Sequence, residues 1–193
     1  MTQYERYKKQ LQNEIFNKKL IKKELKAIKL KDICTIKKGN QLNKSDMVET
    51  GEYYVLNGGK NPSGFTNSWN VNENTITISE GGNSCGYVSF NTEKFYCGGH
   101  CYYLNITSDV DNYYLFNYLK FIELKIMRLR VGSGLPNIQK GDIDNLLIKL
   151  PPIKIQEEIG LFFKFINNYI LLKENEKEMM INFKKALLQQ MFI

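Results

Sequence analysis

One short segment occurs twice in this chain, once near the start and once at the end. Residues 7–16 read Tyr-Lys-Lys-Gln-Leu-Gln-Asn-Glu-Ile-Phe, and residues 183–192 read Phe-Lys-Lys-Ala-Leu-Leu-Gln-Gln-Met-Phe; four of the ten positions are identical. Each copy closes a stretch with helical spacing, and internal repeats reveal architecture. We therefore expect a globular unit, over about residues 30–150, that leaves one helix and returns into an equivalent one. A chance match between two lysine-rich helices is the alternative.

The size and composition of the chain are those of a folded domain with extensions. It has 193 residues, 42% of them hydrophobic and 12% aromatic, which excludes a disordered chain and allows a buried core. Residues 1–31 contain no unbroken apolar run of the signal-peptide kind, and no stretch approaches the roughly 20 apolar residues of a membrane span. We expect a soluble protein with a cytoplasmic location.

The net charge of +7 is concentrated at the beginning of the chain. Residues 1–38 carry 12 Lys+Arg against 4 Asp+Glu, whereas residues 39–150 carry 9 against 11. A lysine cluster of this kind is typical of a protein with a polyanion partner, although the solvated face of a helix explains it as well. The cluster consists of Lys18, Lys19, Lys22, Lys23, Lys26, Lys29 and Lys31.

Two long segments have the apolar spacing of helices. Residues 2–28 follow a three-four spacing without Gly or Pro, and residues 155–187 have apolar side chains at eight of ten seam positions. The pair Pro151-Pro152 predicts an extended lead-in to the second helix. At about 1.5 Å per residue that helix would be roughly 55 to 60 Å long. Because this is too long for one small domain, part of its apolar stripe should meet another helix.

The residues between these helices predict a mostly β domain. Runs of strand length, rich in β-branched and aromatic residues, alternate with loops rich in Gly, Asn and Ser. Residues 111–130 return to helical spacing, with Asp109 and Asp111 as candidate N-caps. The predicted fold class is α+β: a mostly β domain at 30–151 with an internal helix, flanked by long coiled-coil-type helices at 1–29 and 152–193. The predicted strands are residues 52–56, 75–78, 86–90 and 101–106, with a short strand or turn at 30–36.

No residue pattern in the chain predicts catalysis. The single histidine, His100, leaves no obvious Ser-His-Asp or Cys-His site, and neither a phosphate loop nor a dinucleotide fingerprint is present. Cys97, His100 and Cys101 could ligate zinc together with Cys85, but the second ligand pair of a zinc site is missing, and small buried cysteines explain them too. We expect no catalytic residue, no metal site and no cofactor in this chain.

The long polar loops of the middle domain carry side chains suited to nucleic acid. Residues 57–70 combine amides, hydroxyls, a lysine and two aromatic rings, and Arg128 and Arg130 precede a Gly-Ser-Gly loop at 132–134. Asn and Gln amides read adenine in the major groove, Lys and Arg read guanine, and Gly lets backbone N–H groups approach phosphates. Solvated surface loops would have the same composition.

The end of the middle domain resembles part of a known family. Residues 132–143 read Gly-Ser-Gly-Leu-Pro-Asn-Ile-Gln-Lys-Gly-Asp-Ile and run into Leu-Pro-Pro-Ile-Lys-Ile-Gln at 150–156. This pattern resembles the end of a target recognition domain, and the start of the helix after it, in specificity subunits of type I restriction-modification enzymes. Residues 30–39, the glycine pair at 81–82 with Gly-Tyr-Val at 86–88, and the twin Lys-Lys-x-Leu endings are similar to other parts of that family.

The resemblance implies a DNA-recognition subunit that is not itself an enzyme. Adenine methylation, ATP-driven translocation and cleavage would belong to partner modification and restriction subunits, which bring S-adenosylmethionine, ATP and Mg²⁺. Such subunits usually carry two recognition domains, held apart by paired helices, that read a bipartite site on double-stranded DNA. With one domain, this chain would be part of a longer subunit or a natural half-subunit that forms a homodimer through its helices.

Loop side chains that can hydrogen-bond to bases or phosphates are the predicted DNA contacts, with two lysines of the leading helix as separate phosphate contacts. The predicted DNA contacts are Lys44, Asn57, Lys60, Asn61, Ser63, Asn67, Trp69, Asn83, Arg130, Ser133 and Asn137, and the phosphate contacts are Lys22 and Lys26. The alternative function is a helix-mediated scaffold whose β domain binds another protein or a glycan. That alternative predicts no binding to duplex DNA at physiological salt.

Overall fold

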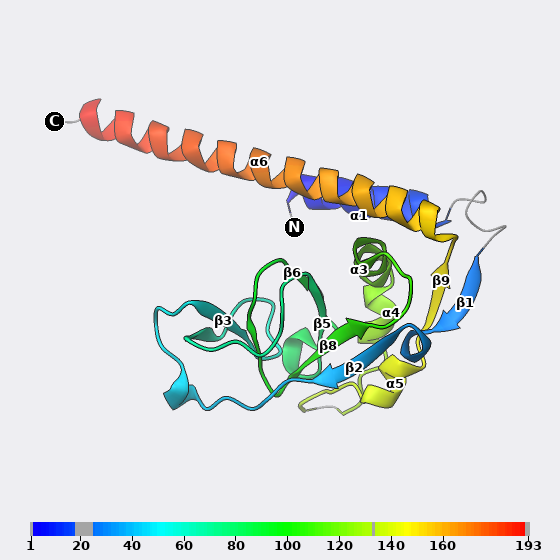
Figure 1. The fold of residues 1–193 in the computed structure, drawn as a ribbon. Coiled ribbons are helices and arrows are strands. Elements are labelled where there is room, and N and C mark those ends of the chain that lie inside the picture. The colour runs from blue at the N-terminus through cyan, green and yellow to red at the C-terminus, as the bar shows by residue number, and fades with distance from the viewer. Residues whose placement is uncertain (1, 18–24, 133, 192–193) are drawn as a thin grey trace.

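The structure is a computed structural model that describes residues 2–17, 25–132 and 134–191. Its central element is an antiparallel sheet of four strands in the order β2-β8-β5-β6 (Figure 1). The central strand β5 alternates Thr and Ile, and its Ile76 and Ile78 are buried, as suits β-branched side chains on a pleated surface. The strands are β2 (Cys34–Lys38), β5 (Thr75–Ser79), β6 (Val88–Asn91) and β8 (Cys101–Ile106).

A smaller sheet of three strands, in the order β4-β3-β7, carries a core of its own. Phe95 is fully buried there, and the ring of Tyr54 stacks on it with 5.6 Å between centroids. The strand predicted at 52–56 is confirmed as β3, whereas β4 and β7 are too short to give a sequence signal. The strands are β3 (Tyr53–Leu56), β4 (Gly64–Thr66) and β7 (Tyr96–Cys97), and the short helix η2 (Lys44–Asp46) precedes them.

Helix α3 (Asn112–Phe121) lies between the large sheet and the terminal helices (Figure 1). It buries Leu115 and Leu119 completely. Asp111 is confirmed as its N-cap, because the carboxylate accepts a hydrogen bond from the Tyr114 amide at 2.6 Å. The single helix predicted over 111–130 is interrupted at Ile122, whose ψ is 9°, and α4 (Glu123–Met127) continues after it.

The helix predicted over residues 2–28 is wrong in its last part. Helix α1 (Gln3–Asn17) ends earlier, and Lys26–Lys29 forms strand β1. Strand β1 pairs antiparallel with β9 (Leu147–Leu150), so that Ile28 lies opposite Ile148. Ile28 fits helical spacing equally well, and the partner strand 120 residues away decides the outcome. The short helices η1 (Leu30–Asp32), η3 (Gly82–Ser84) and α5 (Lys140–Asp144) complete the domain.

The C-terminal helix α6 (Ile153–Met191) is continuous, as its apolar spacing predicts. Helix α1 runs antiparallel beside its first half: the rings of Phe16 and Phe163 are 5.9 Å apart, and Thr2 Oγ1 lies 3.5 Å from Glu174 Oε1 (Figure 1). The second half of α6 extends past the rest of the molecule. Within the described residues, no helix combines the length and the apolar character needed to cross a membrane.

The final Phe of the first repeat copy joins α1 to the domain and to α6. The Phe16 ring is buried, and four other rings lie around it with centroids 5.2 to 5.9 Å away. Those rings belong to Tyr114, Tyr118, Phe121 and Phe163. The repeat therefore marks a helix end that is built into the core. The matching residue of the second copy, Phe192, lies outside the described residues.

Candidate nucleic-acid interface

A shielded carboxylate lies at the edge of the large sheet where β2 and β5 end and β8 begins. Glu80 Oε1 accepts hydrogen bonds from Lys38 Nζ at 2.6 Å and from the Tyr102 hydroxyl at 3.0 Å. Its Oε2 lies 3.7 Å from His100 Nδ1. The side chains of Lys38 and His100 are 51% and 62% exposed, against 12% for Glu80. The carboxylate therefore holds the Lys38 ammonium at the surface of this edge, and the exposed His100 ring lies beside it.

The loop after β3 is attached to the same edge. The Asn57 side-chain oxygen accepts a hydrogen bond from the His100 amide at 3.1 Å, and Ser79 Oγ donates to the carbonyl of Gly58. Gly58 has a φ of +85°, and a Cβ there would lie 2.8 Å from the His100 carbonyl oxygen, so only glycine fits. The side-chain oxygen of Asn57 thus holds the loop after β3 against the backbone of His100.

Two further turns bring polar side chains to this edge. The Gly82 amide donates to the Pro136 carbonyl at 3.0 Å, while Val131 and Asn137 exchange backbone hydrogen bonds of 2.9 and 3.0 Å. The Ile138 amide then donates to the Glu80 carbonyl at 2.8 Å. These bonds place the exposed side chains of Asn83, Arg130 and Asn137 on adjoining turns next to Glu80.

We call this surface the strand-end face. Four of the predicted DNA contacts meet on it, although they are spread over about 80 residues of sequence. Lys38 and His100 are not among the predicted contacts, because the sequence relates the single histidine only to catalysis or metal binding. The strand-end face consists of Lys38, Asn57, Glu80, Asn83, His100, Arg130 and Asn137.

Other predicted contacts lie on the small sheet and its turns. Asn67 accepts a 3.5 Å hydrogen bond from the Glu52 amide, and Lys94 Nζ lies 4.4 Å from the centroid of the Trp69 ring. The exposed predicted residues of this region are Lys44, Lys60, Asn61, Ser63, Asn67 and Trp69.

Of the two predicted phosphate contacts, the structure describes only Lys26. Lys26 is exposed on strand β1, opposite Leu150, whereas the prediction had put it on the leading helix. Lys22 and the loop residue Ser133 lie outside the described residues. Phosphate contact by Lys26 would therefore come from the two-stranded ribbon, and phosphate contact by Lys22 stays a prediction.

The four cysteines are reduced and buried. Burial raises the pKa of Cys34 to about 12 and also raises the pKa of Cys85. Among the residues that the structure describes, no group of three His, Cys, Asp or Glu side chains is arranged to hold a metal ion. Cys97 and Cys101 belong to the core of the small sheet, which accounts for their place in the sequence.

The sequence and the fold both resemble those of known proteins. A family model described as type I restriction modification DNA specificity domain matches residues 22–180. A Mycoplasma pneumoniae protein named as a type I specificity subunit, S.MpnORF638P, is 36% identical over 123 residues, which are 63% of this chain and 32% of the relative. A Mycoplasma genitalium protein with the same kind of name, S.MgeORF438P, is 30% identical over 151 residues, 75% of this chain and 39% of its own length.

Solved structures give the same picture. The S subunit of a type I restriction-modification system from M. genitalium superposes with a TM-score of 0.71 at 28% identity, over 75% of this chain and 39% of that one. The HsdS subunit from Thermoanaerobacter tengcongensis shares the fold, with a TM-score of 0.63 at 17% identity, over 87% of this chain and 44% of that one. The chain thus spans about two fifths of the length of these relatives.

Proposed function

This chain belongs to the family of type I restriction-modification DNA specificity domains, and from this premise we propose that it recognises one half of a bipartite DNA site for a type I restriction-modification complex. The chain is not itself an enzyme. The alternative of a protein-binding or glycan-binding scaffold is abandoned, because the family accounts for both the recognition domain and the long helix.

The observation that carries the proposal is the strand-end face. Hydrogen-bonding side chains from separate segments meet there, on turns fixed by backbone hydrogen bonds. The exposed amides of Asn83 and Asn137 suit bidentate contact with adenine, and Arg130 suits guanine or a phosphate. Lys38 adds a second cation, which Glu80 holds in place. Base reading and backbone positioning are thus both available on one surface.

Helix α6 supports a role in spacing two recognition surfaces. Its 39 residues correspond to roughly 58 Å at 1.5 Å per residue. Its second half carries exposed apolar side chains such as Met179, Phe183 and Leu187. An apolar stripe of this kind suits the helix of a second recognition half, supplied by a longer subunit or by a second copy of this chain. We propose the homodimer for the case in which this chain is a natural half-subunit.

The chemistry of the complex is assigned to other subunits. Modification subunits would methylate adenine with S-adenosylmethionine, and restriction subunits would translocate and cleave DNA with ATP and Mg²⁺. This chain would direct both to the site on double-stranded DNA. We propose that the complex assembles in the cytoplasm.

The test is co-expression with a cognate modification subunit, followed by sequencing-based mapping of methylated adenines. We expect a bipartite motif that depends on this chain. Asn137→Ala, which removes one exposed amide of the strand-end face, should relax or abolish one position of the motif. Lys154→Ala, which removes an exposed cation on α6, should leave the motif unchanged. Methylation with no sequence preference, in a stable complex, would contradict the proposal.

A further inference from the structure

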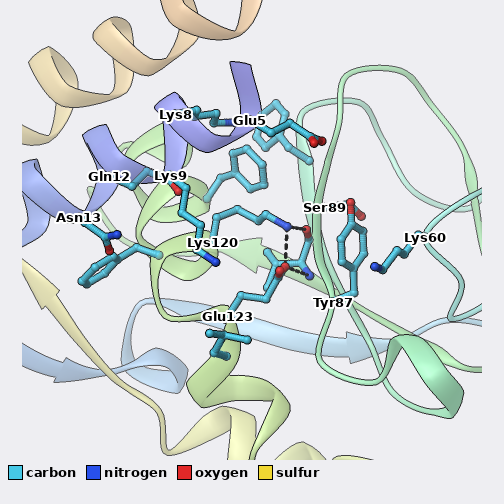
Figure 2. A pocket seen from close by; sticks show the side chains of 15 residues that line it. Glu5, Lys8, Lys9, Gln12, Asn13, Lys60, Tyr87, Ser89, Lys120 and Glu123 are labelled. Atoms are coloured by element: carbon cyan, nitrogen blue, oxygen red, sulfur yellow. Dashed lines mark hydrogen bonds and ion pairs between the residues drawn. The ribbon is translucent and has the colours of Figure 1, made fainter. Parts of the chain in front are cut away.

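A cavity of about 660 Å³ lies between α1, α3 and β6 (Figure 2). None of the residues of the strand-end face lines it. Residues from all three elements line it, together with Lys60 from the turn after β3. A volume of this size is in the range of small-molecule sites. Four of the lining residues are lysines: Lys8, Lys9, Lys60 and Lys120.

The two carboxylates of the cavity are already engaged. Glu123 Oε2 pairs with Lys120 Nζ at 2.5 Å and accepts a hydrogen bond from the Val88 amide at 2.9 Å. Glu5 Oε2 accepts from the Thr2 amide at 2.7 Å. Among the described residues, no carboxylate lies within ion-pair distance of the other three lysines of the cavity. The cavity therefore has a surplus of positive charge.

The surplus of positive charge destabilises the charged form of Lys8. Burial, and then the nearby charge of Lys120, lower the pKa of Lys8 to about 8. Its Nζ lies 5.7 Å from the centroid of the Phe116 ring. An anion in the cavity would compensate both effects and stabilise the charged form of Lys8.

Aromatic side chains form another part of the wall. The Tyr87 ring has Lys120 Nζ 4.2 Å and Lys60 Nζ 5.5 Å from its centroid. Phe90 and Phe121 line the cavity as well, and both are only partly buried. Cations beside flat apolar surfaces suit a ligand that combines a phosphate with a ring, because bases stack on aromatic side chains in many nucleic-acid sites.

We propose that this cavity binds the phosphate of a nucleotide, with Lys8, Lys9 and Lys60 as its ligands. The nucleotide is either a free nucleoside phosphate or one residue of the DNA backbone. If the phosphate belongs to the DNA backbone, the inference rests on the proposed function. If it belongs to a free nucleotide, that nucleotide is a ligand that the proposed function does not require.

The first experiment titrates the full chain with ATP without Mg²⁺, at low ionic strength and pH 7, by calorimetry. We expect saturable binding that Lys9→Glu and Lys60→Glu each weaken roughly tenfold, as expected for a reversed charge near a phosphate at a protein surface. The control is Arg6→Glu, because Arg6 is exposed on α1 but does not line the cavity. It should change the affinity less than twofold, and thermal melting of all three variants verifies that they fold.

The second experiment adds a short DNA duplex. Displacement of ATP by the duplex, with weaker duplex binding by Lys9→Glu but not by Arg6→Glu, assigns the phosphate to the DNA backbone. ATP binding that the duplex does not displace assigns it to a free nucleotide. If ATP does not bind, and both cavity variants bind the duplex as the wild type does, the inference is wrong. That result would leave the methylation test of the proposed function unaffected.

Discussion

Gly160 of α6 lies directly against the carboxylate of Asp111, which caps α3. The Asp111 carboxylate accepts its hydrogen bond from the Tyr114 amide at 2.6 Å, and a Cβ on Gly160 would overlap Asp111 Oδ1 and lie 3.3 Å from the Tyr114 amide nitrogen. The absence of a side chain at position 160 thus allows the long helix to cross the capped end of α3 at close range.

We expect Gly160→Ala to destabilise the protein by about 1 to 3 kcal/mol, because the new methyl group would displace the cap or push α6 away. The measurement is urea unfolding followed by circular dichroism. Gly141→Ala is the matched control: a Cβ there meets nothing within 4 Å, so it should be neutral or stabilising. Equal effects of the two substitutions would show that helix propensity, and not the crossing, decides the stability at position 160.

The partly buried ammonium of Lys8 should make stability depend on pH. Its pKa is lowered to about 8 in the folded chain from 10.5, so between these pH values the unfolded chain binds more protons and the unfolding free energy rises with pH. We expect Lys8→Met to flatten this rise and to stabilise the protein at pH 7 by on the order of 1 kcal/mol. The charged and titratable groups around Lys8 are Glu5, Lys9, Lys60, Tyr87, Lys120 and Glu123.

The measurement is unfolding between pH 7 and 9.5 in a buffer free of phosphate and nucleotides. Higher pH is avoided, because burial raises the pKa of several tyrosines, including that of Tyr54 to about 12, and their ionisation in the unfolded chain lowers stability. Arg6→Met, a change at an exposed residue of α1 that does not line the cavity, is the control. A slope unchanged by Lys8→Met would exclude Lys8 as its source.

The second half of α6 should exchange its amide hydrogens rapidly in the isolated chain. Residues 175–190 are exposed throughout, and an unsupported helix of this length is only marginally stable in water. Hydrogen exchange with mass spectrometry should find the first half, around Ile159 and Phe163, strongly protected. Addition of a partner half should slow exchange in the second half. Equal protection of both halves in the dilute chain would contradict this expectation.

Removing two cations from the recognition domain should weaken DNA binding and its salt dependence together. Lys60→Ala combined with Arg130→Ala removes two predicted contacts, and each lost phosphate contact lowers the slope of log K against log salt by roughly 0.9. Fluorescence anisotropy at several salt concentrations measures the slope. Lys154→Ala should leave it unchanged, and an unchanged slope in the double variant would remove Lys60 and Arg130 from the phosphate contacts.

The cysteine thiols should be unreactive in the folded protein. All four are buried, which keeps reagents away from the thiols, and burial raises the pKa of Cys34 to about 12, so that Cys34 carries almost no thiolate at neutral pH. A thiol reagent such as Ellman's should label the four cysteines slowly without denaturant and within minutes in guanidinium chloride. Fast labelling of the native chain would indicate an accessible thiol that the fold does not show.

The sequence predicted those parts of the fold whose signal is local. The long helix α6, the strands β3, β5, β6 and β8 and the Asp111 cap each depend on residues close together in the chain. Strand β1 was read as helix, because Lys-Ala-Ile-Lys has no strong preference of its own and becomes a strand only by pairing with β9. Short strands such as β4 and β7 likewise form only because they pair with β3.

The candidate site could be predicted only in part for the same reason. The composition of the loops indicated Asn83, Arg130 and Asn137, but no sequence pattern shows that the turns carrying them are joined by backbone hydrogen bonds. Lys38 and His100 belong to the strand-end face because both lie beside Glu80. The position of Glu80 follows from the register of β5 on β8. Register is a property of the folded sheet and has no local signal at Glu80.

The chain enters the recognition domain along β1 and leaves it along β9. These two strands pair with each other as a two-stranded ribbon, in which Lys26 lies opposite Leu150. Everything between these two strands is therefore topologically a single insert in a helical frame. A gene recombination with both crossovers in the ribbon would exchange the whole strand-end face while keeping α6 and its crossing at Gly160. If the strand-end face reads DNA as we propose, one such event would replace the DNA target and leave the long helix unchanged.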